Sequence, residues 1–138
     1  MYHSHKVLKI KPKLIADISN IAGHYDENPP KVKNINIMFN TLKYDYYIIG
    51  IADWQLYYCI DYRESYEYYL RRRIILEAPK GIDADILFIL KAIHDDCPIL
   101  TNDRLQDHLD LLPSEWWLET HRIPFDIIKG EFRIYLPK

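Results

Sequence analysis

The chain has 138 residues, enough for one domain with a buried core and too few for two average domains. Apolar residues make up 49% of it and charged residues 28%, which excludes an intrinsically disordered chain. The net charge of −2 excludes a strongly basic protein, although a domain can still bind a polyanion if its cations gather on one surface.

Short apolar segments alternate along the chain with longer segments of helical periodicity. This alternation predicts a mostly parallel central sheet covered by helices, a three-layer α/β/α sandwich. The expected strands are residues 13–17, 46–52, 74–78 and 98–101. The expected helices are residues 31–43, 57–73 in one or two pieces and 83–94, with shorter pieces near 104–109 and 114–118. Alternating apolar residues on both sides of Lys129-Gly130 predict a C-terminal β pair, most simply a hairpin.

The sequence shows neither a membrane-spanning segment nor a secretory signal. No segment approaches the ~20 apolar residues of a membrane-spanning helix, so we expect no membrane partner. Residues 1–13 have no continuous apolar core and do not resemble a secretory signal. We therefore expect a cytoplasmic protein of one domain, residues 1–138, in which residues 1–12 form an N-terminal extension.

Acidic residues recur where the predicted strands end and the next helices begin. Asp17 ends the first strand, Asp85 lies in the first turn of the helix over 83–94, and Asp103 follows the fourth strand. The carboxyl ends of parallel strands form one crevice where ligands bind, so these residues are expected to converge. Asp107 would share a helical face with Asp103, four residues earlier, and Asp83 flanks the set.

Carboxylates gathered in this way repel one another, and a divalent cation removes the repulsion. Oxygen ligands favour Mg²⁺ or Mn²⁺ over zinc. Such a site can activate a water molecule and neutralise charge that develops on a phosphodiester during hydrolysis. The pattern therefore indicates metal-assisted cleavage of a phosphodiester.

Helix capping is the alternative explanation for most of these acids. An Asp or Asn at a helix start satisfies free backbone N–H groups and suits the helix dipole without any further function. Asp83, Asp85, Asn102 and Asp103 each fit that description when taken alone. The argument for a site depends on the joint arrangement, in which Asp17 ends a strand and is not expected to be a cap.

Three sequence motifs resemble the PIN-like nucleases, and most closely their NYN branch, which includes the Regnase-type ribonucleases. They are the run from Leu14 to Asn20, the run Gly81 to Asp85 that opens a helix, and the run Ile99 to Arg104 followed by Asp107. The resemblance covers about residues 13–136 and includes Asp53-Trp54 after the second strand.

The resemblance implies a role for each matching position. Asp17, Asp85, Asp103 and Asp107 would be catalytic and would hold Mg²⁺ or Mn²⁺, with Asp83 as a further ligand. Asn20 would orient the substrate or a metal-bound water. Single-stranded RNA is the substrate that the family implies. The chain departs from the family at Ala84, in place of the first acid of the doublet, and at Ile18, where the family often has Gly.

The predicted edge also offers candidates for binding RNA. Lys80 and Arg104 could position phosphates, Asn102 could contact the substrate, and Trp54 could stack on a base. The run Arg71 to Arg73 is better explained as a helix C-terminus. Tyr62, Tyr66 and Tyr69 follow helical spacing, which indicates a packed face and is compatible with a homodimer.

Three functions remain open from the sequence. The first is a metal-dependent endoribonuclease acting on single-stranded RNA. The second is a catalytically inactive PIN-like RNA-binding or scaffold module, which the replacement at Ala84 motivates. The third is the toxin nuclease of a toxin–antitoxin pair, with the same chemistry and a dedicated inhibitor protein.

Overall fold

Five parallel strands form the central sheet of the structure, a computed structural model that describes residues 10–137. Most of the N-terminal extension expected over residues 1–12 lies outside the described residues. The strand order is β3–β2–β1–β4–β5, so the direction of winding reverses between β1 and β4. The strands are β1 (Lys13–Asp17), β2 (Tyr47–Ala52), β3 (Ile75–Glu77), β4 (Ile99–Leu100) and β5 (Arg122–Ile123). In sheets of this kind, ligands bind at the carboxyl edge where the order reverses.

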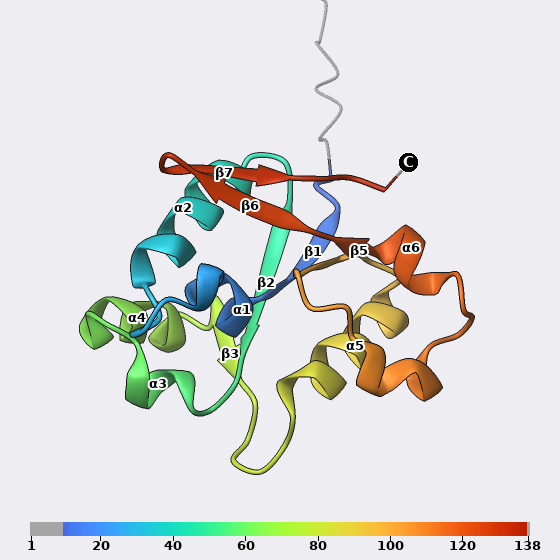
Figure 1. Cartoon of the computed structure of the whole chain (residues 1–138), viewed down its shortest axis with the longest axis horizontal. Helices are drawn as coiled ribbons and strands as arrows, with labels where there is room; N and C mark the ends of the chain where they lie inside the picture. The colour runs from blue at the N-terminus through green and yellow to red at the C-terminus, as the bar shows by residue number, and fades with distance from the viewer. Residues whose placement is uncertain (1–9, 138) are drawn as a thin grey trace, which may run out of the picture.

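Helices cover both faces of this sheet and confirm the expected three-layer α/β/α sandwich (Figure 1). One face is covered by α1 (Ile18–Ala22), α2 (Val32–Leu42), α3 (Leu56–Cys59) and α4 (Arg63–Arg71). The other face is covered by α5 (Ala84–Asp95) and α6 (Trp117–His121). The 3₁₀ segments are η1 (His24–Asp26) and η2 (Gln106–Leu111). No helix within residues 10–137 is long and apolar enough to span a bilayer.

The two faces of β1 explain why the sequence of this strand is almost continuously apolar. Leu14 and Ala16 are fully buried against α1, α2 and α4, whereas Ile15 is fully buried against α5. A central parallel strand has no solvent-facing side and therefore needs apolar residues at every position. The strand ends at Asp17, which is buried with the rest of it.

A separate antiparallel hairpin closes the chain, as the alternation around Lys129-Gly130 predicts. It consists of β6 (Phe125–Ile128) and β7 (Glu131–Ile134), and it lies across α2 (Figure 1). Lys129 and Gly130 form the turn with φ angles of 51° and 77°. Positive φ at both turn residues is the two-residue connection that matches the twist of a hairpin.

Several elements differ from the sequence-based expectation. The helix expected over residues 57–73 is divided into α3 and α4, and α1 and β5 are too short for their periodicity to be visible. Tyr66 and Tyr69 of α4 pack on the core of their own chain, while Tyr62 precedes the helix and is exposed. Most of the apolar surface of this helix is thus used internally, and the homodimer stays a prediction.

Gly50 is required for close packing between β2 and its neighbours. A Cβ atom at this position would lie 2.9 Å from Cδ1 and Cγ1 of Ile18 and 3.0 Å from Cγ1 of Ile75. We expect Gly50→Val to lower the free energy of unfolding by about 1–3 kcal/mol, because the extra atoms overpack a filled core. Urea unfolding of wild type, Gly50→Ala and Gly50→Val would measure it. Equal midpoints for the three proteins would contradict the close packing.

Candidate metal centre at the carboxyl edge of the sheet

Asp17 is the most buried acid of the carboxyl edge, with 5% of its surface exposed. Its Oδ2 atom accepts a hydrogen bond from Oγ1 of Thr101 at 2.7 Å, which joins the ends of β1 and β4. Its Oδ1 atom accepts from the backbone N–H of Asn20 at 3.3 Å, so Asp17 is the N-cap of α1. The expectation that capping does not apply to Asp17 is therefore wrong, because α1 begins directly after the strand.

The charge on Asp17 is destabilised by its surroundings. Burial raises the pKa of this carboxyl to about 7, against a smaller lowering by the Thr101 hydroxyl. The carboxylates of Asp85 and Asp103 raise the pKa further. The three acids that the sequence predicts to converge are thus within electrostatic reach of one another.

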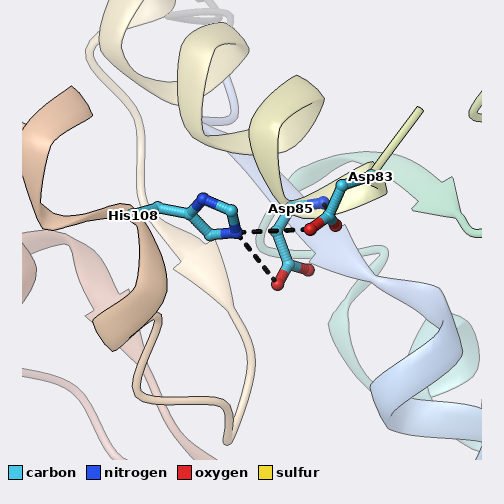
Figure 2. A group of neighbouring side chains, drawn as sticks. All are labelled: Asp83, Asp85 and His108. Atoms are coloured by element: carbon cyan, nitrogen blue, oxygen red, sulfur yellow. Dashed lines mark hydrogen bonds and ion pairs between the residues drawn. The ribbon is translucent and has the colours of Figure 1, made fainter.

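Asp85 and Asp83 lie at the start of α5 and face His108 of η2 (Figure 2). Nε2 of His108 lies 3.4 Å from Oδ2 of Asp83 and 3.7 Å from Oδ2 of Asp85. The three side chains offer ligand atoms that all lie within 4.8 Å of one another. Burial, then Asp83 and Asp103, raises the pKa of Asp85 to about 6, while His108 lowers it.

From the sequence, His108 lies beside Asp107 and could meet a substrate, although a surface role is the favoured prediction. In the structure its side chain is only 14% exposed and reaches back to the acidic start of α5. It belongs to an irregular 3₁₀ segment in which its own backbone is non-helical, so no periodicity indicates where it points.

Asp53 is a further acid of this edge and follows the end of β2. Its Oδ1 atom accepts a hydrogen bond from the backbone N–H of Ala84 at 3.3 Å, and its charge contributes to the raised pKa of Asp85. Its own N–H donates to Oγ of Ser19 at 2.9 Å. The rule that brings Asp17 and Asp103 together, an acid after a parallel strand, also applies to Asp53.

Asp103 lies in a tight turn after β4. Its N–H donates to Oγ1 of Thr101 at 3.1 Å, and its Oδ1 atom accepts from the N–H of Leu105 at 2.8 Å. Leu105 is buried and has a φ angle of 55°, so the chain turns sharply before η2 begins at Gln106. Asp103 and Asp107 therefore do not share a helix, and the expected common face is wrong. Asp107 is exposed on η2.

Asn20 and Asn102 tie separate elements together beside the acids. The N–H of Asn102 donates to Oδ1 of Asn20 at 2.9 Å. Oδ1 of Asn102 accepts in turn from the N–H of Phe125 at 2.9 Å, at the start of the hairpin. Both side-chain oxygens hold backbone in place, which leaves only the amide NH₂ groups for a substrate or a water.

The residues expected to bind RNA lie at two separate places. Nζ of Lys80 is 5.4 Å from the ring centre of Trp54, and both side chains line one cavity. Arg104 is exposed and lines a different cavity of about 360 Å³ together with Arg122 and Tyr135. The two groups flank the acids from opposite sides of the winding reversal, because Trp54 follows β2 and Arg104 follows β4.

No family model matches the chain, but two curated proteins are similar to part of it. Proteinaceous RNase P 3 of Arabidopsis thaliana is 26% identical over 81 residues, which are 56% of this chain and 14% of the relative. Proteinaceous RNase P 2 of the same plant is 26% identical over 80 residues, 55% of this chain and 15% of the relative.

Solved structures of the second relative extend the match to nearly the whole fold. A crystal structure of nuclear proteinaceous RNase P 2 from A. thaliana superposes with a TM-score of 0.76 at 19% identity, over 93% of this chain and 30% of the other. A second structure of that protein gives a TM-score of 0.73 at 20% identity, with the same coverage. The catalytic domain of these proteins is an NYN domain of the PIN-like superfamily. The chain has the fold of that domain.

The resemblance expected from the three acidic motifs is thereby confirmed. The chain spans only 14% and 15% of the length of the curated relatives that it matches. The whole activity of those proteins therefore does not follow from the shared fold.

The comparison also corrects the expected location. The two solved structures are of one protein that is described as nuclear, which conflicts with the cytoplasmic location predicted from the sequence. That prediction is wrong because it rested on the lack of a secretory signal, which does not distinguish one compartment from another inside the cell.

Proposed function

We propose that this NYN domain is a metal-dependent endoribonuclease that hydrolyses phosphodiester bonds of single-stranded RNA. The observation that carries the proposal is the convergence of Asp17, Asp85 and Asp103 from three elements, where the charge of Asp17 is opposed by Asp85 and Asp103 and the charge of Asp85 by Asp103. A divalent cation bound between these carboxylates would offset the repulsion between their charges. We further propose that residues 1–138 form this one domain.

The side chains present fit a hard divalent cation. Asp17, Asp85 and Asp103 would hold Mg²⁺ or Mn²⁺, and Asp83 would assist from the start of α5. When bound, the ion supplies an activated water and neutralises charge on the phosphodiester. Asp107 is not part of the proposed ligand set, because it is exposed on η2 and has no helical relation to Asp103.

The surrounding residues would hold these carboxylates in place. The Thr101 hydroxyl donates to Asp17 and accepts from the backbone of Asp103, so one buried side chain positions two of the acids. One oxygen of Asp103 is engaged by the N–H of Leu105, which leaves the other available. The NH₂ group of Asn20 is available to orient a water or a phosphate oxygen, and Lys80 and Arg104 would position the flanking phosphates.

RNA is proposed as the substrate because the similar proteins are ribonucleases by name. The proposed RNA substrate rests only on the part of those proteins that this chain matches.

A catalytically inactive RNA-binding module is the second candidate, favoured by the missing acid at position 84. Ala84 is buried, with 2% of its surface exposed. However, the carboxylate of Asp53 contacts the N–H of Ala84 and supplies an acid at the same helix start. The active enzyme therefore remains the better-supported function.

A cleavage assay on matched labelled RNA and DNA strands tests the proposal. We expect the single-stranded RNA to be cut with Mn²⁺ or Mg²⁺, and EDTA to stop the reaction, because the acids need the ion. RNA binding without cleavage under any of these ions would favour the inactive module. Equal cutting of DNA and RNA would contradict the proposed substrate.

A further inference from the structure

A small aromatic cavity opens beside the proposed metal centre and has no role in holding the ion. Its volume is about 190 Å³, and it is lined by Trp54, Tyr57, Tyr58, Glu77 and Lys80. Trp54 follows Asp53 directly, and Glu77 ends β3 opposite Ala52 of β2. The cavity thus lies at the same carboxyl edge as the acids, displaced toward the outer strand of the sheet.

The aromatic walls are held in place by contacts within the protein. Tyr58 meets Trp54 edge-on at 6.2 Å and Tyr57 edge-on at 5.3 Å. The Tyr57 hydroxyl donates to Oε1 of Glu67 at 2.6 Å, and the Arg63 guanidinium lies over its ring at 5.1 Å. Rigid aromatic faces of this kind bind flat rings with little loss of side-chain entropy.

One wall of the cavity is a hydrogen-bond acceptor. Burial raises the pKa of the Glu77 carboxyl, and the nearby Tyr66 hydroxyl lowers it. The buried Tyr66 hydroxyl acts on Glu77 as a hydrogen-bond donor, and a carboxylate has two oxygens, so Glu77 keeps acceptor capacity for a further donor. An ionised carboxylate can accept hydrogen bonds but not donate them.

We propose that this cavity binds one unpaired base of the RNA substrate and selects bases that carry an amino group. The inference rests on the proposed function for its substrate. The base would stack on the aromatic walls, and Glu77 would accept from the amino group of adenine, cytosine or guanine. Uracil presents a carbonyl oxygen where cytosine has its amino group, and this oxygen cannot donate a hydrogen bond to Glu77.

The size and charge of the cavity agree with one nucleotide as the occupant. Sites for drug-sized ligands measure about 300–1,000 Å³, so this smaller cavity suits a single ring system. Lys80 lies over Trp54 with its ammonium 5.4 Å from the ring centre, where it can meet the phosphate attached to a stacked base.

Sequencing the ends of cleavage products from a randomised RNA pool tests the selection. Wild type should show a depletion of uracil at one fixed position relative to the cut bond. Glu77→Gln should lose this depletion, because the amide both donates and accepts and can therefore also meet the carbonyl oxygens of uracil. Glu64→Gln, an exposed glutamate at the start of α4, is the matched control and should keep it. An unchanged profile in Glu77→Gln would overturn the proposal.

A binding measurement in EDTA separates this inference from the nuclease activity. Adenosine monophosphate should shift the indole NMR signal of Trp54, identified with Trp54→Phe, at a concentration at least ~10-fold lower than uridine monophosphate does. Tyr44→Ala is the control. Lys43 lies over the Tyr44 ring at 5.2 Å, as Lys80 lies over Trp54, but this pair precedes β2 and so lies at the amino edge of the sheet.

The two measurements have distinct failures. Selective binding of the adenine nucleotide by a protein that cuts no RNA would support base binding in the cavity and would contradict the proposed nuclease function. Cleavage without selective nucleotide binding and without base bias would contradict base binding in the cavity and would support the nuclease function.

Discussion

Replacing Asp17 by asparagine is expected to abolish metal-dependent cleavage while making the metal-free protein more stable above pH 7. The two effects have one cause, because the same buried carboxylate would hold the ion and destabilises the fold when it is ionised without one. Asp17 is 5% exposed, and its pKa is raised to about 7 by burial and by Asp85 and Asp103. Asparagine has nearly the same shape and carries no charge.

The pH dependence follows from the direction of this shift. An unfolded Asp has a pKa near 3.9, so between about pH 4 and pH 7 the folded protein binds the proton and the unfolded chain does not. The stability of wild type therefore falls as the pH rises through this window, and the loss is complete above pH 7. It amounts to ~2–4 kcal/mol, since one pKa unit corresponds to about 1.4 kcal/mol and relaxation reduces the full value.

Urea unfolding at pH 4, 6 and 8 in EDTA would measure this difference. Asp17→Asn should match wild type at pH 4 and exceed it at pH 8, and Mn²⁺ should stabilise only wild type. Asp45→Asn, an exposed acid before β2, is the control and should follow wild type throughout. If Asp17→Asn is less stable than wild type at pH 8, the ionised Asp17 carboxylate does not destabilise the metal-free fold.

Asp85→Asn is expected to lower the rate of RNA cleavage roughly 100-fold or more while the protein remains folded. The loss corresponds to several kcal/mol of transition-state stabilisation, which is the usual contribution of a metal site. The fold is spared because Asp83, not Asp85, caps α5 by accepting the N–H of Asp85 at 2.9 Å. Helix capping and the proposed chemistry are thus divided between neighbouring side chains.

Single-turnover cleavage of one RNA by three isosteric variants would check this division. Asp83→Asn should lose less than about tenfold, because asparagine is also a good N-cap and the residue is half exposed. Asp107→Asn should lose little, because this acid is exposed on η2. A wild-type rate in Asp85→Asn would remove this residue from the proposed ligands, and an unfolded variant would show that its role is structural.

The sequence predicts the convergence of Asp17, Asp85 and Asp103 because strand ends and helix starts are visible in hydrophobic periodicity. Parallel pairing then determines that they share one edge. The failures occur where periodicity is lost. Segment 102–105 has an irregular backbone with Leu105 at positive φ, so the helical spacing assumed for Asp103 and Asp107 does not exist.

Short elements and tertiary contacts account for the other differences. Helix α1 has five residues, too few for a periodic signal, and its presence makes Asp17 a cap as well as a strand end. His108 reaches the acids only through the fold, across more than twenty positions of sequence. The role of Asn102 is likewise tertiary, since its side chain meets the backbone of Phe125 rather than a neighbour in sequence.

The bonds from Asn20 to Asn102 and from Asn102 to Phe125 make the C-terminal hairpin a brace for the loop that carries Asp103. A shortened protein that ended before Pro124 would retain every acid proposed here, yet this loop would lose its anchor on one side. The smallest active unit should therefore extend through β7, even though no residue of the hairpin belongs to the acidic cluster.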